Sequence, residues 1–166
     1  MIYLLLDSST TYLSVGLVKD NKLIKKTSYP CFQQQSEFMV EEIAKLLKAS
    51  KVPVKKINAV VTSIGPGSYT GIRIALTIAK VMCYALKIPL IPLSTLEINK
   101  VIGKNSIVLF NARSNRSYFG VYLNNQIIEK DQIKDNEDVL EYINDHKDYV
   151  ITGDVSYLSL VSEKYN

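Results

Sequence analysis

Histidine and cysteine are scarce in this chain, which limits the chemistry that it can perform. His146 is the single histidine among 166 residues, and the two cysteines, Cys31 and Cys83, are far apart and match no metal-binding or redox spacing. Protein metal sites need several such side chains close together. The sequence therefore excludes a histidine-based metal centre and predicts no metal site. His146, between Asp145 and Lys147, is expected to be a solvated loop residue.

Long apolar runs are also missing. We find no stretch of about twenty uninterrupted apolar residues, and no basic segment that precedes an apolar segment and a cleavage site. We therefore expect a cytoplasmic protein with no membrane association. Twenty Lys and Arg against sixteen Asp and Glu give a net charge of +4, which permits contact with nucleic acid without requiring it.

A glycine-rich segment, SIGPGSYTGIR at residues 63–73, lies between an apolar run and a long apolar stretch typical of a helix. A Walker A loop would need a lysine, and the dinucleotide fingerprint would need a glycine at Thr70, so the spacing fits neither phosphate loop. Two interpretations remain: a tight turn whose glycines allow close approach of strand and helix, or a helix start whose amides hold an anion. The candidate anion or nucleotide contacts in this segment are Gly67, Ser68, Tyr69, Thr70, Gly71 and Arg73.

The chain contains an internal repeat. At an offset of 104 residues, IYLLLDSSTTYLSVGLVKDNKLIKK from residue 2 matches SIVLFNARSNRSYFGVYLNNQIIEK from residue 106 without gaps. Each copy reads strand, polar loop, strand, two-residue turn and strand. The turn pairs, Asp-Asn at 20–21 and Asn-Asn at 124–125, suit a type I′ hairpin because these residues tolerate positive φ.

Each hairpin is followed by a helical pattern and an apolar strand that ends in glycine. The expected elements are helices at 36–49, 71–86 and 137–144 and strands at 57–65 and 149–153. Two tandem βββαβ units are the plan of the actin, Hsp70 and sugar-kinase superfamily. We therefore predict an α/β fold with an N-terminal actin-like lobe at 1–103 and a smaller, shortened lobe at 104–166.

Four stretches resemble one protein family. GPGSYTGIRIALTIAK, the LLLDSST start, IPLIPLSTLE and NARSNRSYFGVY are similar to the bacterial TsaB (YeaZ) family of tRNA threonylcarbamoyladenosine biosynthesis proteins, from Met1 to about Asp154. The resemblance implies an actin-like fold and a place in the cytoplasm with an actin-like catalytic subunit, TsaD, and a P-loop ATPase, TsaE. It implies a complex that transfers threonylcarbamoyl from threonylcarbamoyl-AMP to N6 of the adenosine 3′ of the anticodon, in tRNAs that read codons beginning with A.

The chain departs from the family pattern in three respects. Asn111 and Asn115 stand where members usually have aspartate and glycine, and Gln35-Ser36-Glu37 stands where they have His-Ser-Glu. Family members also tend to be some dozens of residues longer. The second lobe is therefore expected to lack part of its C-terminal helical cover.

The residues themselves favour a scaffold over a catalyst. An actin-like ATPase needs two turns in which aspartate is followed closely by glycine. The first turn here, Asp7-Ser8-Ser9-Thr10, keeps the acid but has serine in place of glycine, and the second, Asn-Ala-Arg-Ser at 111–114, has neither. We therefore predict a noncatalytic subunit that binds and orders TsaD and has no cofactor of its own. ATP or ADP is expected only at a site shared with the partner complex, with Asp7 among its contacts.

The alternative is a small self-contained enzyme of the same fold, a nucleotide-binding ATPase or a peptidase. A serine peptidase needs a base within hydrogen-bond reach of the nucleophile and a third group that orients the base. His146 is the only histidine that could serve, and no G-x-S-x-G motif surrounds any serine.

Two expected helices, at 36–49 and 71–86, are apolar around most of their circumference. Either they cover one another inside the lobe, or they form a helical interface with a second protein. The interface candidates are Phe38, Met39, Ile43, Leu46, Ile72, Ile74, Ala75, Ile78, Ala79 and Met82. The chain alone would be expected to pair with a second copy through a two-fold axis, for which the partner would compete.

Five lysines lie in and just after the first of these helices: Lys45, Lys48, Lys51, Lys55 and Lys56. Lysines at the end of a helix complement its dipole. They could also contact tRNA phosphates, and since no aromatic residue is interleaved, such contact would be salt-sensitive and indifferent to base sequence. Otherwise we expect tRNA to be reached only through the complex.

Overall fold

The structure, a computed structural model, describes residues 1–124 and 126–158 and divides into two compact units, Met1–Leu93 and a second that begins at Ser94. The elements of the first unit are β1 (Ile2–Asp7), β2 (Tyr12–Lys19), β3 (Lys22–Pro30), α1 (Gln35–Ala49), the 3-10 helix η1 (Val54–Lys56), β4 (Ala59–Ser63), α2 (Tyr69–Leu86) and β5 (Leu90–Leu93). Those of the second are α3 (Thr95–Ile98), β6 (Ser106–Arg113), β7 (Arg116–Leu123), β8 (Gln126–Asp135), α4 (Asn136–Asp145) and β9 (Val150–Gly153).

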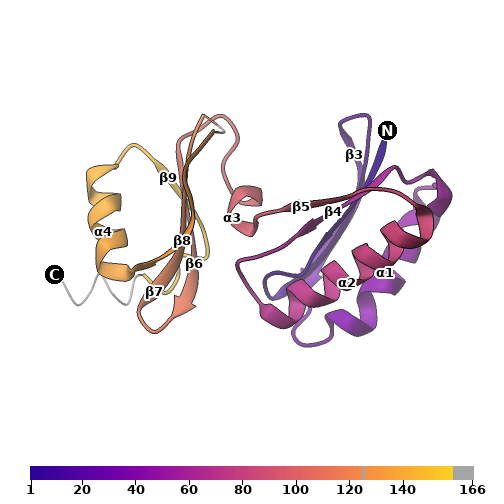
Figure 1. The fold of residues 1–166 in the computed structure, drawn as a ribbon, viewed down its shortest axis with the longest axis horizontal. Helices are drawn as coiled ribbons and strands as arrows, with labels where there is room; N and C mark the ends of the chain where they lie inside the picture. Colours follow the sequence, from indigo (N-terminus) through magenta and orange to yellow (C-terminus); the bar gives the residue numbers. More distant parts are fainter. Residues whose placement is uncertain (125, 159–166) are drawn as a thin grey trace. The chain divides into compact units, whose positions relative to one another are not determined.

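The first unit is a five-stranded sheet with α1 and α2 against it (Figure 1). The strand order is β3-β2-β1-β4-β5; β2 is antiparallel to both of its neighbours, whereas β4 is parallel to β1 and β5. Parallel neighbours need a crossover connection, which α1 and α2 supply. One core joins the helices to the sheet and includes the alternating residues Leu4, Leu6, Leu13, Val15 and Leu17 of β1 and β2.

The tight turn of the first hairpin has the predicted backbone. Asp20 and Asn21 have φ of 49° and 62°, the left-handed region that these two residue types tolerate. In the second hairpin Asn124 has φ of 48°, and Asn125 lies outside the described residues.

The second unit repeats this topology. Its sheet order, β8-β7-β6-β9, corresponds strand for strand to β3-β2-β1-β4, with an antiparallel hairpin and a parallel last strand. Phe119 of β7 and Val139 of α4 are fully buried in its core. The duplicated βββαβ plan of the actin, Hsp70 and sugar-kinase superfamily is thereby confirmed. Residues 159–166, which end the predicted smaller lobe, lie outside the described residues.

The two hairpins differ by one residue in register. Leu5 lies opposite Gly16 in the first, whereas Val108, and not Leu109, lies opposite Gly120 in the second. The turn between β6 and β7 is shorter than the turn between β1 and β2. The gapless sequence match therefore aligns β1 with β6 and β2 with β7, but the residues that pair across β1 and β2 are not matched to the residues that pair across β6 and β7.

The short helix α3 belongs to the second unit, although the sequence places the lobe boundary after residue 103. Leu96 of α3 is fully buried with Val108 and Tyr122. Burial of one large apolar side chain contributes about 1.5–3 kcal/mol, so this contact holds α3 to the sheet that follows it.

Helix α2 is, among the described residues, the one helix whose length and composition would also suit a membrane span. The core helix of a globular domain meets the same test, so this is weak evidence. α2 packs on its own sheet through Ala75 and Ala79, which have no exposed surface, and presents Arg73 and Lys80 to solvent. α2 is therefore a helix that lies on its own sheet by one narrow face.

The small size of Ala79 sets the distance between α2 and the sheet, so Ala79→Leu should destabilise the chain by about 1–3 kcal/mol through overpacking. The matched control is Val81→Leu, two residues along, where the side chain is 62% exposed and the change should cost nothing measurable. Urea unfolding followed by circular dichroism gives both free energies. Equal stability of the two variants would contradict the close approach of helix and sheet.

Candidate functional site

The glycine-rich segment lies against the turn between β1 and β2 of its own unit. A Cβ atom added to Gly67 would sit 2.3 Å from the carbonyl oxygen of Ser9, and one added to Gly71 would sit 1.8 Å from that of Ser8. Real Cβ atoms do not come this close to backbone. The two glycines therefore permit close approach of two backbones, as the first of the two interpretations requires.

Hydrogen bonds join the same two segments. The Ser68 amide donates to the Ser9 carbonyl at 2.7 Å, and the Ser8 hydroxyl donates to the Gly71 carbonyl at 2.7 Å. The Asp7 carboxylate accepts from the Ser9 amide at 3.0 Å and from the Ser63 hydroxyl of β4. The turn that would hold phosphate in an actin-like ATPase is thus bonded to the chain's own backbone.

The start of α2 keeps part of its capacity to bind an anion. Ser68 caps the helix by accepting from the Gly71 amide at 3.2 Å. No hydrogen bond between described residues uses the amides of Tyr69 and Thr70. Arg73 donates to the Tyr69 hydroxyl at 2.9 Å, with its guanidinium 5.2 Å from the centre of that ring. Contact of these residues with an anion stays a prediction.

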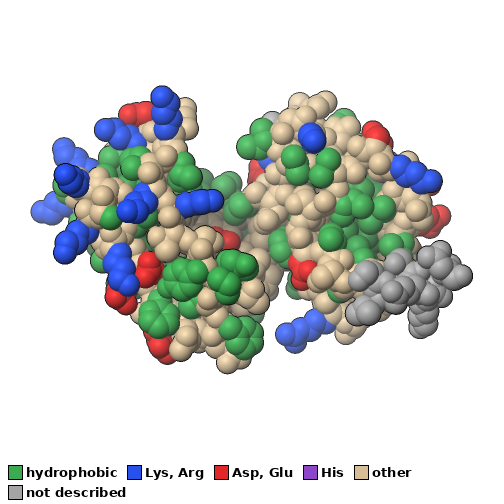
Figure 2. Space-filling model, turned by 180° about the vertical axis from the view of Figure 1, so that it is seen from behind, with side chains coloured by type: hydrophobic (Ala, Val, Ile, Leu, Met, Phe, Trp, Pro, Cys, Tyr) green, Lys and Arg blue, Asp and Glu red, His purple; other side chains and the backbone are tan. Residues whose placement is uncertain are grey.

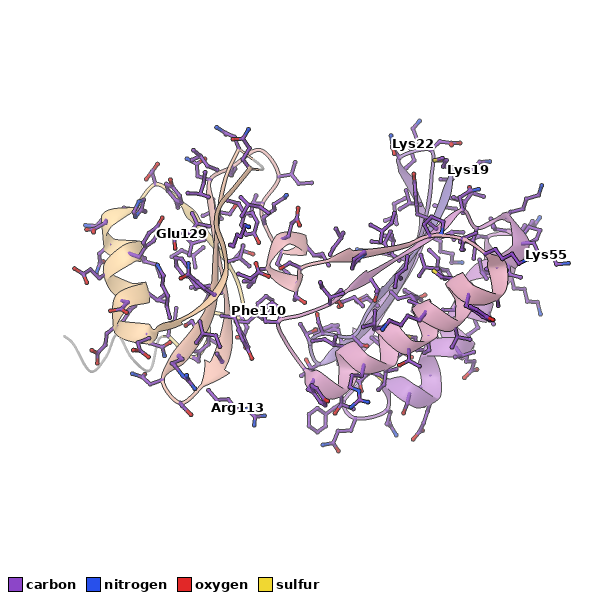
Figure 3. The ribbon with its side chains drawn as sticks, viewed as in Figure 1. Lys19, Lys22, Lys55, Phe110, Arg113 and Glu129 are labelled. Atoms are coloured by element: carbon purple, nitrogen blue, oxygen red, sulfur yellow. The ribbon has the colours of Figure 1, made fainter. Side chains whose placement is uncertain are left out.

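The corresponding turn of the second unit carries no carboxylate. The side-chain oxygen of Asn111 accepts from the Arg113 amide at 2.8 Å, just as Asp7 accepts from Ser9. Arg113, Ser114 and Asn115 follow with φ of 64°, 50° and 58°. Figure 3 shows the Arg113 side chain extending away from the tip of this turn. An amide at Asn111 cannot hold Mg²⁺ or its waters as a carboxylate does.

A buried polar cluster hydrogen-bonds to this turn at Asn115. Asn136, at the start of α4, donates its backbone amide to the Asn115 carbonyl at 3.0 Å and accepts from the Ser117 hydroxyl at 2.7 Å. Ser117 also bonds to the hydroxyl of Tyr157, whose pKa is raised by burial. These groups satisfy one another, so the cluster is a structural support.

An open groove of about 460 Å³ lies between α1 and α2. Its lining residues are Ser36 and Val40 of α1 and Tyr69, Thr70, Arg73, Ile74, Thr77 and Ile78 of α2. The groove starts at the glycine-rich segment and follows the outer side of the two helices. It is the surface at which the predicted helical interface and the predicted anion contacts adjoin.

The ten interface candidates divide into two groups. Met39, Ile43, Leu46, Ala75 and Ala79 are at most 5% exposed and belong to the core of the first unit. Phe38, Ile72, Ile74, Ile78 and Met82 are half-buried, and four of them, all except Ile72, also contact that core. Five of the ten thus lack surface for a partner in this structure, and a partner would meet the half-buried set.

Three exposed apolar side chains on these helices were missed by the sequence analysis. Val40, Val81 and Tyr84 are 59%, 62% and 89% exposed. Periodicity alone groups Tyr84 with the polar residues of α2, such as Arg73 and Lys80, and Val81 with the apolar ones. A projection of α2 aligned on Ala75 and Ala79, which mark the face on the sheet, would have found Val81 and Tyr84.

A model of the family described as TsaD, tRNA N6-adenosine threonylcarbamoyltransferase, matches residues 31–160. The chain belongs to this family. A TsaB protein of Buchnera aphidicola from Schizaphis graminum is 35% identical over 76% of this chain, and the TsaB protein of Bacillus subtilis is 29% identical over 74%. The resemblance to TsaB is thereby confirmed. The chain spans 63% and 55% of the length of these two relatives.

A solved structure shares the fold of this TsaB-like chain. It is a Pseudomonas aeruginosa protein described as similar to peptidase YeaZ, with a TM-score of 0.76, 22% identity, and coverage of 82% of this chain and 67% of the other. At this identity the likeness shows the fold alone.

The single histidine has structural contacts. His146 follows α4, donates from Nδ1 to the Tyr142 carbonyl at 2.8 Å, and stacks on the Tyr142 ring with the two ring centres 4.1 Å apart. The residue lies in the turn after α4, as expected of a loop residue, but its ring is half-buried by this stacking. No serine of the described chain hydrogen-bonds to His146, and no group of three potential metal ligands occurs among the described residues.

Gly71→Ala tests the close approach at the glycine-rich segment. In an ordinary helix this change stabilises by up to about 1 kcal/mol, whereas here the new Cβ meets the Ser8 carbonyl and should destabilise by about 2 kcal/mol or more. Thr70→Ala, in the same turn but exposed, is the control. Thermal and urea unfolding measure both, and a Gly71→Ala variant as stable as the wild type would contradict the geometry.

Proposed function

We propose that this chain acts in tRNA threonylcarbamoyladenosine biosynthesis as a noncatalytic subunit that binds and orders a TsaD-like catalytic subunit. The observation that carries the proposal is the turn between β1 and β2, which is bonded to the chain's own glycine-rich segment. Its partners would be TsaD, a TsaE-like ATPase and, through the complex, tRNA, in the cytoplasm. The names of the relatives supply the pathway.

The loss of both phosphate turns supports the noncatalytic role. In the first turn Asp7 is engaged by Ser9 and Ser63, and in the second Asn111 replaces the carboxylate. Transfer to or from a nucleotide needs amides that approach the phosphates and carboxylates that hold the metal or its waters. ATP or ADP would therefore bind only where a partner completes a site beside Tyr69, Thr70 and Arg73.

The groove between α1 and α2 is the proposed contact with the catalytic subunit. Val40 lines the groove beside the half-buried Ile74 and Ile78 and exposes apolar surface there. Val81 lies one turn along α2 from Ile78, outside the groove lining, and extends the exposed apolar surface on a helix that packs on its own core. A preformed apolar face loses little conformational entropy on binding. In the absence of the partner, a second copy of the chain would cover the same face.

The isolated chain should hydrolyse no ATP above background, with or without Mg²⁺. Asp7→Asn should leave that background unchanged, because the Asp7 carboxylate is occupied within the fold. A phosphate-release assay measures both proteins. Magnesium-dependent turnover that disappears in Asp7→Asn would overturn the noncatalytic role.

Val40→Asp and Val81→Asp, made separately, should each weaken binding of the TsaD-like subunit by at least about tenfold, or 1.4 kcal/mol, because an unpaired carboxylate would be buried at the contact. Self-association should fall in parallel. Both side chains are exposed, so the melting temperature should stay at the wild-type value.

Ile102→Asp is the matched control, since Ile102 is 82% exposed and lies in the second unit. Calorimetry with the TsaD-like subunit and analytical ultracentrifugation of the chain alone provide the measurements. If the Val40 and Val81 variants bind the TsaD-like subunit and self-associate like the control, α1 and α2 only cover one another.

A further inference from the structure

Seven of the eleven lysines of the first unit lie at the end of the sheet where β1 and β4 begin. Residues 1–93 carry 12 Lys and Arg against 5 Asp and Glu, whereas residues 94–166 carry 8 against 11. The basic excess of the chain therefore belongs to its first unit. Figure 2 shows blue side chains concentrated at one end of that unit, and Figure 3 places the labelled Lys19, Lys22 and Lys55 there.

Backbone hydrogen bonds show why these segments meet. The amide of Asp20, in the β2–β3 turn, donates to the Met1 carbonyl at 2.9 Å, and the amide of Asn58 donates to the Ile2 carbonyl at 2.8 Å. The Val60 amide donates to the carbonyl of residue 89 at 3.1 Å. Three segments therefore lie side by side at one end of the strands: the β2–β3 turn, the segment from α1 through η1 to β4, and the segment between α2 and β5.

We call this surface the lysine-rich end. Its exposed members are Lys19, Lys22, Lys48, Lys51, Lys55, Lys56 and Lys87. The three segments that carry them, 19–22, 48–58 and 87–89, contain a single acidic residue, Asp20. Asp20 pairs with the N-terminal amine, which lowers the pKa of its carboxyl group. Among the described residues no carboxylate pairs with these lysines, whereas Lys45 is held by Glu41 and Glu42.

Local structural roles account for only part of this set. Lys48 lies in the last turn of α1 and Lys87 caps α2, so both complement a helix dipole. Lys19 and Lys22 lie on a hairpin, and Lys55 and Lys56 on a single 3-10 turn, where no such dipole needs them. A surface that served only solubility would mix both signs of charge.

We propose that the lysine-rich end binds the phosphate backbone of RNA, so that the chain itself holds part of the substrate; this rests on the proposed function. Lysines act as point charges toward phosphate and do not read bases. The three segments contain no aromatic side chain on which a base could stack. Contact is therefore independent of base sequence and strongly dependent on salt.

The shape of the surface favours RNA over an anionic membrane. Membrane-binding basic segments are typically amphipathic helices that lie in the interface with an apolar face inserted. Here the charges come from turns and helix ends, and the apolar groove between α1 and α2 opens at the glycine-rich segment. That segment follows the C-terminal end of β4, at the opposite end of the strands from the lysine-rich end.

The test compares two triple variants that remove the same charge. Lys51→Gln/Lys55→Gln/Lys56→Gln changes the lysine-rich end, and Lys80→Gln/Lys130→Gln/Lys147→Gln changes exposed lysines elsewhere. Fluorescence anisotropy with labelled bulk tRNA and with an unrelated RNA hairpin, at several salt concentrations, measures affinity for the full chain alone and with the TsaD-like subunit.

The first variant should weaken binding of both RNAs by about tenfold or more, and should lower the slope of log affinity against log salt by about 2 to 3. The control should stay within about twofold of the wild type. A second triple, Lys19→Gln/Lys22→Gln/Lys87→Gln, should repeat the effect if the first is poorly folded. The proposal is overturned if the control loses as much RNA affinity as the first variant. It is also overturned if the wild type binds no RNA, either alone or with the TsaD-like subunit.

Two further measurements separate the alternatives. Sedimentation with phosphatidylcholine–phosphatidylserine vesicles that depends on the lysine-rich end, with RNA affinity unchanged in the variants, would assign the surface to a membrane and overturn the proposal. Binding of the TsaD-like subunit should be equal for wild type and both variants. Failure of the wild type to bind that subunit would refute the proposed function. If the variants bind the subunit normally and keep wild-type RNA affinity, only the RNA-binding role of the lysine-rich end is refuted.

Discussion

The contact between the glycine-rich segment and the Ser8-Ser9 backbone is the constraint on which the first unit depends. It positions the start of α2, and through α2 the groove toward α1, by bringing two backbones closer than any side chain at Gly67 or Gly71 would allow. The same contact occupies the turn at which an actin-like ATPase would hold phosphate. One local arrangement thus positions the helix pair and engages the polar groups of this turn within the fold.

Duplication followed by divergence explains the second unit. Both turns keep an Asx-type bond, from Asp7 to Ser9 and from Asn111 to Arg113, although the carboxylate survives only in the first. The conserved topology preserves the sheet and its crossover, because these depend on apolar alternation and turn chemistry. Asp7 and Asn111 lie outside the apolar core, so an acid in one unit can stand where its amide stands in the other while the fold is kept.

The first unit presents two different surfaces at opposite ends of its sheet. At the C-terminal end of β4 the glycine-rich segment adjoins the apolar groove between α1 and α2. At the start of β1 and β4 lie seven lysines and one acidic residue, Asp20, which pairs with the N-terminal amine. Apolar contact suits a protein partner and unpaired lysines suit a polyanion. Under the proposed function, the groove would meet the catalytic partner and the lysine-rich end would meet its nucleic-acid substrate.

The repeat, the turn residues and the helix periodicity were sufficient to predict the duplicated βββαβ fold, because these signals are local and agree with one another. The motif spacing also excluded the two common phosphate loops. Three-dimensional contacts decided the rest: which half of the ten apolar candidates is buried, that Val40 and Val81 are exposed, that one hairpin is shifted by a residue, and that Leu96 ties α3 to the second unit. The lysines of the lysine-rich end are spread over residues 19–87 in the sequence, and only the contacts between strand ends bring them onto one surface. Sequence periodicity records which faces are apolar, but the partner of each face is set by packing between segments far apart in the chain.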